Sequence, residues 1–194
     1  MNGLAGKLVR YALILMIVAS IASGSLAYTY EITRERIEKM RLQEQLNAVQ
    51  EVCGSIVGKG SVSPDKEALE LASRKVEILN AVFRVEKEGQ VLAYGFLVSP
   101  RGYGGPLTMM VGIDKEGRVT GIKVLEHRET PGLGDKVVAG SEFLEQFKNK
   151  TPSDPVEIKK DIDAVSGATI SSKGVTAGVR AALDAFEALK EGER

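Results

Sequence analysis

The first segment of the chain is an apolar run without helical or strand periodicity. Residues 11–30 carry no charged side chain. A helix of about 20 residues spans about 30 Å, the thickness of the hydrocarbon core of a bilayer, so this run predicts a transmembrane helix. The alternative is a signal peptide cleaved near Ser25, Leu26 and Ala27, because these residues resemble a small-residue cleavage site. We favour the membrane anchor because the run has full spanning length and a helical pattern follows it.

A helical pattern continues beyond the apolar run. Residues 31–52 lack Gly and Pro and place apolar side chains among charged ones, which is typical of an exposed helix. Gly54 and the two glycines that follow it are expected to end this helix. A turn at residues 63–65 then leads into a short helical stretch. We therefore expect a helical connector over residues 31–74, without chemistry of its own.

The pattern becomes typical of strands after residue 80. Residues 81–85 and 91–98 bracket one tight turn, and residues 107–113 and 119–125 bracket a second one. Four short strands in two hairpins predict an antiparallel sheet, and so an α+β fold rather than a doubly wound parallel sheet. The glycine patterns of dinucleotide-binding folds and of P-loops do not occur in the sequence.

The last predicted element is an amphipathic helix from about Ser172 to Leu189. Its apolar residues recur every three or four positions, at 175, 179, 183, 186 and 189, so they share one face. Ser171 or Ser172 can cap its N-terminus. Residues 75–194 are therefore expected to form one domain, in which helices flank the antiparallel sheet.

Charge and composition narrow the range of functions. The chain has 26 Lys and Arg against 26 Asp and Glu, 5% aromatic residues and no Trp. This argues against a nucleic-acid partner, which needs a basic surface. One Cys and one His exclude an internal disulfide and make a metal site implausible. Lys7 and Arg10 are the charged residues before Glu31. The positive-inside rule then keeps residues 1–10 in the cytoplasm and places the domain outside the cytoplasmic (inner) membrane.

Three glycine-rich segments carry the candidate chemistry, at residues 101–106, 127–134 and 163–169. The third segment directly precedes the last helix. Thr169 therefore lies just outside a helix N-terminus, where free N–H groups and the helix dipole favour an anion. Gly167 allows the backbone to approach a ligand closely. A phosphate esterified to Thr169 would therefore be well placed. The alternative is an ordinary helix N-terminus rich in Ser and Thr, which would have the same sequence pattern.

These segments resemble, in matching order, three signatures of the FMN-binding domain family. The motif Asp-x-x-Ser-Gly-Ala-Thr at residues 163–169 is similar to that family's flavinylation motif. The resemblance implies that Thr169 carries FMN through a phosphoester bond, which a flavin transferase installs from FAD. Asp163 would be recognised by the transferase. The turn around the phosphate would consist of Ser166, Gly167 and Ala168.

The resemblance also implies a site for the flavin ring. The residues expected to line it are Tyr103, Gly104, Glu129, Thr130, Gly132, Leu133 and Gly134. Gly132 and Gly134 would permit close contact of the backbone with a flat ring, Leu133 would pack on its face, and Thr130 would donate a hydrogen bond. His127 and Cys53 are expected to be structural.

With one N-terminal anchor and this length, the chain is most similar to the G subunits of Rnf-type electron transport complexes. The resemblance implies an electron-transfer subunit that relays electrons through FMN, in a membrane complex that couples reduced ferredoxin and NAD to ion transport. It would have no catalysis of its own, since the flavin does the chemistry. The implied partners are the membrane, other subunits of the complex and the flavin transferase. The alternatives are a C subunit of a sodium-translocating NADH:quinone reductase and a non-redox anchored scaffold that binds a ligand.

Overall fold

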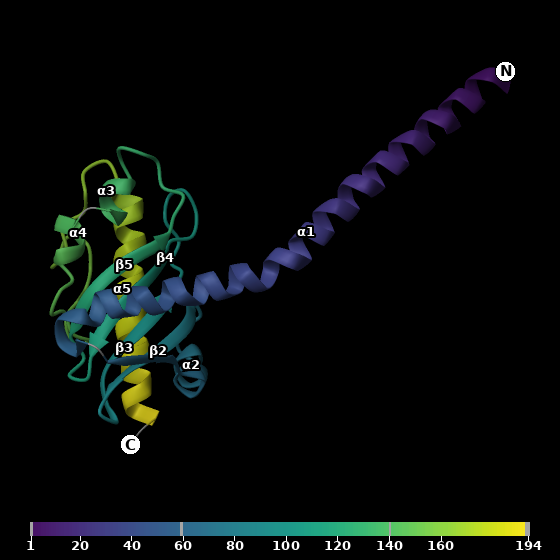
Figure 1. The fold of residues 1–194 in the computed structure, drawn as a ribbon. Coiled ribbons are helices and arrows are strands. Elements are labelled where there is room, and N and C mark those ends of the chain that lie inside the picture. Colours follow the sequence, from purple (N-terminus) through teal and green to yellow (C-terminus); the bar gives the residue numbers. More distant parts are fainter. Residues whose placement is uncertain (1, 59, 140, 193–194) are drawn as a thin grey trace. The chain divides into compact units, whose positions relative to one another are not determined.

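The computed structural model describes residues 2–58, 60–139 and 141–192. The chain divides into two compact units, Met1–Glu44 and Gln45–Arg194. The helices are α1 (Asn2–Val57), α2 (Lys66–Ser73), α3 (Asp135–Val138), α4 (Ser141–Glu145) and α5 (Thr169–Gly192) (Figure 1). The strands are β1 (Ser61–Pro64), β2 (Leu79–Lys87), β3 (Gln90–Val98), β4 (Thr108–Asp114) and β5 (Val119–Glu126).

The first unit consists of the long N-terminal part of α1. Every large apolar side chain between Leu8 and Ile32 is exposed. In the described part of the chain, α1 is the helix long and apolar enough to cross a membrane, and a signal sequence near the N-terminus would have the same properties. The helix predicted over residues 31–52 is confirmed and runs on without a break to Val57. Gly54 lies inside it, and Gly58 follows its end with a φ of 57°.

The second unit contains one antiparallel sheet in the order β1-β2-β3-β4-β5. Both predicted hairpins are confirmed, as β2 with β3 and as β4 with β5. Strands adjacent in sequence are adjacent in the sheet, which is the topology that short turns favour. The α+β fold expected from the sequence is therefore confirmed.

Strand β1 was not predicted, because its residues were expected to belong to the helical connector. It has four residues, which are largely exposed, so it lacks the apolar alternation that identifies a strand. Its pairing with β2 sets it at the edge of the sheet, where Pro64 is tolerated. Asp65 follows it and caps α2 by accepting a hydrogen bond from the N–H of Ala68 at 3.0 Å.

The sheet has a hydrophobic core on each face. Met109 and Val111 of β4 belong to the core that contains the apolar residues of α2 and α5, whereas Met110 between them packs with the C-terminal part of α1. This alternation follows from the period of two along a strand. Figure 1 shows α5 crossing one face of the sheet and the end of α1 crossing the other.

A row of glycines allows the end of α1 to lie directly on the sheet. Gly95, Gly112 and Gly121 are paired neighbours on β3, β4 and β5. A Cβ at Gly95 would lie 2.7 Å from a methyl group of Val49, and one at Gly112 would lie 2.9 Å from the sulfur of Cys53. These distances are too short for side chains at the glycine positions. The glycine row is therefore the surface of the sheet on which the end of α1 packs.

Helix α5 begins three residues earlier than predicted, at Thr169. The N–H of Ala168 donates to the carbonyl of Val165, and the hydroxyl of Ser172 donates to the carbonyl of Ala168. These bonds close the chain into a turn that leads directly into the helix. The predicted cap at Ser171 or Ser172 is therefore wrong, since both residues lie inside the first turn of α5 and are buried.

Candidate functional site

The three glycine-rich segments meet at one end of the strands. The end of β3, the start of β4 and the end of β5 lie at this same end of the sheet, because neighbouring strands are antiparallel. The segments enclose a cavity of about 510 Å³, within the usual size of ligand sites. We call it the ring cavity. It is lined by Tyr103, Glu129, Thr130, Leu133, Gly134, Gly167, Ala168, Thr169, Ile170 and Ser171.

The ring cavity contains most of the residues that the sequence singled out, but not all. Those that do not line it are Gly104, Gly132, Ser166 and Asp163. Ile170 and Ser171 do line it and were missed, because α5 was expected to begin after them. Ile170 is 54% exposed. In the sequence, the available signal for Ile170 as a site residue was an apolar residue next to Thr169 that does not belong to the repeating apolar face of α5.

Large apolar side chains surround the ring cavity. Tyr103 and Leu133 come from the first and second segments and Ile170 from the start of α5, and all three are exposed. A Cβ at Gly167, which has a φ of 79°, would lie 3.3 Å from a methyl group of Leu133. The cavity therefore offers a flat apolar group contacts from all three segments.

Glu129, which lines the cavity, connects the second segment to the first segment and to α5. Its carboxylate is buried and accepts hydrogen bonds from the N–H of Gly104 at 3.2 Å and from the hydroxyl of Ser171 at 2.5 Å. A Cβ at Gly102 would lie 2.2 Å from one carboxylate oxygen, and a Cβ at Gly134 would lie 2.5 Å from the other. The packing of Gly134 on Glu129 is by itself a reason for a glycine at this position, and Gly134 also lines the ring cavity.

The N-terminus of α5 presents free backbone donors. No described residue accepts a hydrogen bond from the backbone N–H groups of Thr169, Ile170 or Ser171. Such groups at the positive end of a helix favour an anion. Thr169 itself is exposed, so its hydroxyl is accessible to another protein.

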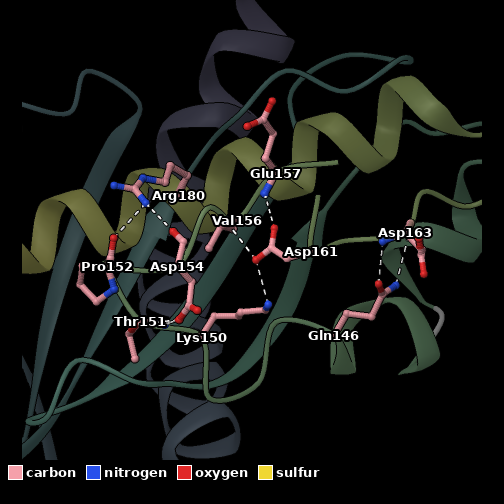
Figure 2. Close-up of polar contacts among 10 residues, drawn as sticks. All are labelled: Gln146, Lys150, Thr151, Pro152, Asp154, Val156, Glu157, Asp161, Asp163 and Arg180. Carbon is pink, nitrogen blue, oxygen red and sulfur yellow. Dashed lines mark hydrogen bonds and ion pairs between the residues drawn. The ribbon is translucent and has the colours of Figure 1, made fainter. Parts of the chain in front are cut away.

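A second cavity, of about 660 Å³, shares Thr169 with the ring cavity. We call it the cationic cavity. Lys159, Lys173 and Arg180 line it, against one carboxylate, that of Glu157. Arg180 is held in place because its guanidinium donates to the carbonyls of Pro152 and Asp154 at 3.1 and 3.0 Å (Figure 2).

The wall of the cationic cavity is a loop organised by Asp161. Figure 2 shows its carboxylate accepting from the N–H groups of Val156 and Glu157 and from Lys150, at 3.2, 2.8 and 2.8 Å. Burial alone would raise the pKa of Asp161, but these bonds outweigh it and lower the pKa. They also hold Val156 at a φ of 44°, a conformation that a β-branched residue rarely adopts.

Asp163 lies apart from both cavities. Its backbone exchanges two hydrogen bonds with the side chain of Gln146, at 2.8 and 3.2 Å (Figure 2), and its carboxylate is exposed. His127 accepts a hydrogen bond from the N–H of Glu129 at 3.3 Å and does not line the ring cavity. Cys53 is buried under the glycine row, and burial raises its pKa to about 11. The structural roles of His127 and Cys53 stay predictions.

Comparison with known proteins agrees with this arrangement. The FMN-binding domain family model matches residues 102–184, which include the second and third glycine-rich segments and all but Arg101 of the first, and the RnfG N-terminal region matches residues 1–52. The G subunit of the ion-translocating oxidoreductase complex of Stutzerimonas stutzeri is 32% identical over 181 residues, which are 89% of this chain and 78% of that protein. The G subunit of the Na(+)-translocating ferredoxin:NAD(+) oxidoreductase complex of Acetobacterium woodii is 31% identical over 194 residues, 94% of this chain and 93% of that protein.

Solved structures show a similar fold. NqrC of Shewanella oneidensis matches with a TM-score of 0.55 at 21% identity, over 77% of this chain and 97% of that one. The C subunit of the Na(+)-translocating NADH-quinone reductase of Parabacteroides distasonis matches with a TM-score of 0.53 at 20% identity, over 80% and 94%. The alternative of a C subunit is thus supported in fold alone, whereas similarity over most of the sequence is to G subunits. The chain therefore belongs to the family of G subunits of ion-translocating oxidoreductase complexes.

Proposed function

We propose that this chain is the electron-transfer subunit of an Rnf-type ferredoxin:NAD oxidoreductase complex and relays electrons through FMN attached covalently to Thr169. Of the two G subunits named above, one belongs to an ion-translocating oxidoreductase complex and the other to a Na(+)-translocating ferredoxin:NAD(+) oxidoreductase complex. The observation that carries the proposal is the position of Thr169, an exposed hydroxyl shared by an apolar cavity and a cationic one. FMN has the same division, since an apolar ring system and an anionic phosphate lie at its two ends.

The residues around Thr169 fit these two ends. The phosphodiester would accept hydrogen bonds from the free N–H groups at the start of α5, and Lys159 and Lys173 would balance its charge. Tyr103, Leu133 and Ile170 would cover the ring and exclude water from it. The bound FMN would supply reversible electron uptake, while the protein supplies position and electrostatics.

Attachment requires a second protein. In the reaction inferred here, the Thr169 oxygen forms a bond to the FMN phosphorus of FAD, the pyrophosphate bond breaks, and AMP leaves. A base of the flavin transferase takes the hydroxyl proton. The exposure of Asp163, Ser166 and Thr169 leaves this motif open to the transferase.

We further propose that the domain faces the extracytoplasmic side of the cytoplasmic membrane. Lys7 and Arg10 would keep residues 1–10 inside, residues 11–30 would span the bilayer, and the following part of α1 would lead into the compact unit Gln45–Arg194, which contains the proposed flavin domain 75–194. The single proposed span has no charged residue and contains no ion path. Ion transport is therefore assigned to other subunits of the complex.

The proposal is tested by intact-mass measurement of the full-length protein, produced together with a flavin transferase. We expect the mass of the chain plus one FMN minus one water, located on the peptide with residues 166–169. Thr169→Val should give folded, colourless protein, because α5 is held by its own apolar face. Thr130→Val removes a hydroxyl from the same cavity and should retain the flavin.

Two results would contradict the proposal. Covalent flavin on Thr169→Val would move the attachment to another residue. Wild-type protein without flavin after production with the transferase would favour the non-redox scaffold instead.

A further inference from the structure

The buried carboxylate of Glu129 has no cationic partner among the described residues. Among the described residues, the buried acids are Glu129 and Asp114. Asp114 forms an ion pair with Arg118 at 2.8 Å, whereas the described partners of Glu129 are the neutral Gly104 N–H and Ser171 hydroxyl. These two donors satisfy its oxygens without balancing its charge.

Neighbouring backbone fixes the position of this charge. Gly102 and Gly134 pack so closely on the carboxylate that a Cβ at either would overlap one of its oxygens. The hydroxyl of Ser171 ties the carboxylate to α5. Glu129 therefore holds its carboxylate at the lining of the ring cavity in one fixed place.

We propose that Glu129 lowers the reduction potential of the flavin. This inference rests on the proposed function. Electron uptake adds negative charge to the ring, and a fixed, buried carboxylate at the lining of the same cavity disfavours that addition through Coulomb repulsion. Among the residues that the structure describes, no cationic side chain lines the ring cavity to offset the effect, whereas Lys159, Lys173 and Arg180 line the cationic cavity. Glu129 is thus a positioning and tuning residue, and the flavin remains the group that reacts.

The test is a spectroelectrochemical titration of full-length, flavinylated Glu129→Gln in detergent. The amide has nearly the same shape, can accept from the Gly104 N–H and contact Ser171, and removes the charge. We expect its potential to be more positive than that of the wild type, by on the order of a tenfold change in the equilibrium, or about 59 mV for a one-electron couple. Glu67→Gln, which neutralises an exposed carboxylate on α2 that lines neither cavity, should not change the potential.

Glu129→Met is a second neutral variant of similar length, and its potential should shift in the same direction. A neutral variant that carries covalent flavin at the wild-type potential would overturn the inference. Failure of both neutral variants to fold or take flavin, with normal behaviour of Glu129→Asp, would assign Glu129 a purely structural role and would also overturn it. Absence of covalent flavin from the wild type would instead refute the proposed function.

Discussion

Glycine serves two different purposes among the residues of the candidate site. Gly134 has a negative φ of −69° and is small because the Glu129 carboxylate occupies the space where a side chain would lie. A Cβ at Gly132 would have nothing within 4 Å, but the φ of this residue is 81°. The first glycine is thus required by packing and the second by backbone conformation.

Alanine substitutions should separate the two purposes. Gly132→Ala should cost about 1–2 kcal/mol of the free energy of unfolding, the usual penalty of a positive φ, and leave the flavin unchanged. Gly134→Ala should cost about 1–3 kcal/mol by overpacking and should also shift the flavin spectrum, since it displaces Glu129. Urea unfolding and visible spectra of the full-length protein measure both effects. Identical spectra in the two variants would contradict the role assigned to Gly134.

Asp161 makes the wall of the cationic cavity sensitive to acid. Its folded-state pKa is lowered, while the unfolded value is about 3.9. A carboxylate with a lowered pKa stabilises the fold above the unfolded pKa, and this contribution is lost as the pH falls through the folded pKa.

Asp161→Asn should therefore cost on the order of 1–2 kcal/mol of the free energy of unfolding at pH 7. The difference from the wild type should shrink below about pH 4, where the wild-type carboxylate also becomes neutral. Urea unfolding between pH 3 and 7 gives both values. Asp163→Asn is the matched control, because the carboxylate of Asp163 is exposed, and it should have little effect. A difference independent of pH would contradict the role given to the charge.

Among the elements, the end of α1 and the glycine row depend on each other. Val49, Val52 and Cys53 complete a core with residues of β2, β3 and β4. The hydroxyl of Thr120 on β5 donates to the carbonyl of Val52 at 2.6 Å, which fixes the helix along the row. The last turns of α1 are therefore part of the folded domain, and the compact unit accordingly begins at Gln45.

Gly112→Val should displace α1 and expose Cys53. The new side chain would begin 2.9 Å from the Cys53 sulfur, and we expect a cost of about 1–3 kcal/mol. In the wild type, burial and a pKa of about 11 should make Cys53 react slowly with a thiol reagent. Labelling should be faster in Gly112→Val. Gly54→Ala, where the added methyl has nothing within 4 Å, should keep the slow rate, and equal rates in all three proteins would contradict this packing.

At the scale of the whole molecule, the two units require different surroundings: the first has an exposed apolar surface, and the second buries its apolar residues. Side chains from Leu8 to Ile32 present a continuous apolar surface, which requires a membrane or a partner helix. The second unit buries its apolar residues on both faces of the sheet. An anchored domain in water is the simplest arrangement that satisfies both parts.

The proposed orientation predicts the behaviour of reporter fusions. A reporter that works only in the cytoplasm should be inactive when fused after Arg194 and active when fused before Met1, because Lys7 and Arg10 retain the N-terminus inside. Intact mass of the membrane-bound protein should include residues 1–27, which a cleaved signal peptide would lack. Cytoplasmic activity of the C-terminal fusion would reverse the orientation.

The sequence alone determined the features that depend on neighbouring residues. Periods of two and of three to four residues predicted both hairpins and α5, because side chains on one face recur at those intervals. The length and apolar composition of residues 11–30 predicted the first part of α1. The resemblance of the three glycine-rich segments, in matching order, to the FMN-binding domain family implied the FMN site and the attachment to Thr169. Strand β1 and the first turn of α5 escaped prediction, since an edge pairing and a tight turn have no such period.

The tertiary structure decided what these residues do together. Gly104 and Ser171 meet the Glu129 carboxylate although they lie 25 and 42 positions from it in the chain. The division between an apolar and a cationic cavity depends on how loops from separate parts of the chain fold around Thr169. Side-chain spacing along a chain carries no information on such distant approaches, so the reason for Gly134 and the uncompensated charge of Glu129 became visible only in the folded domain.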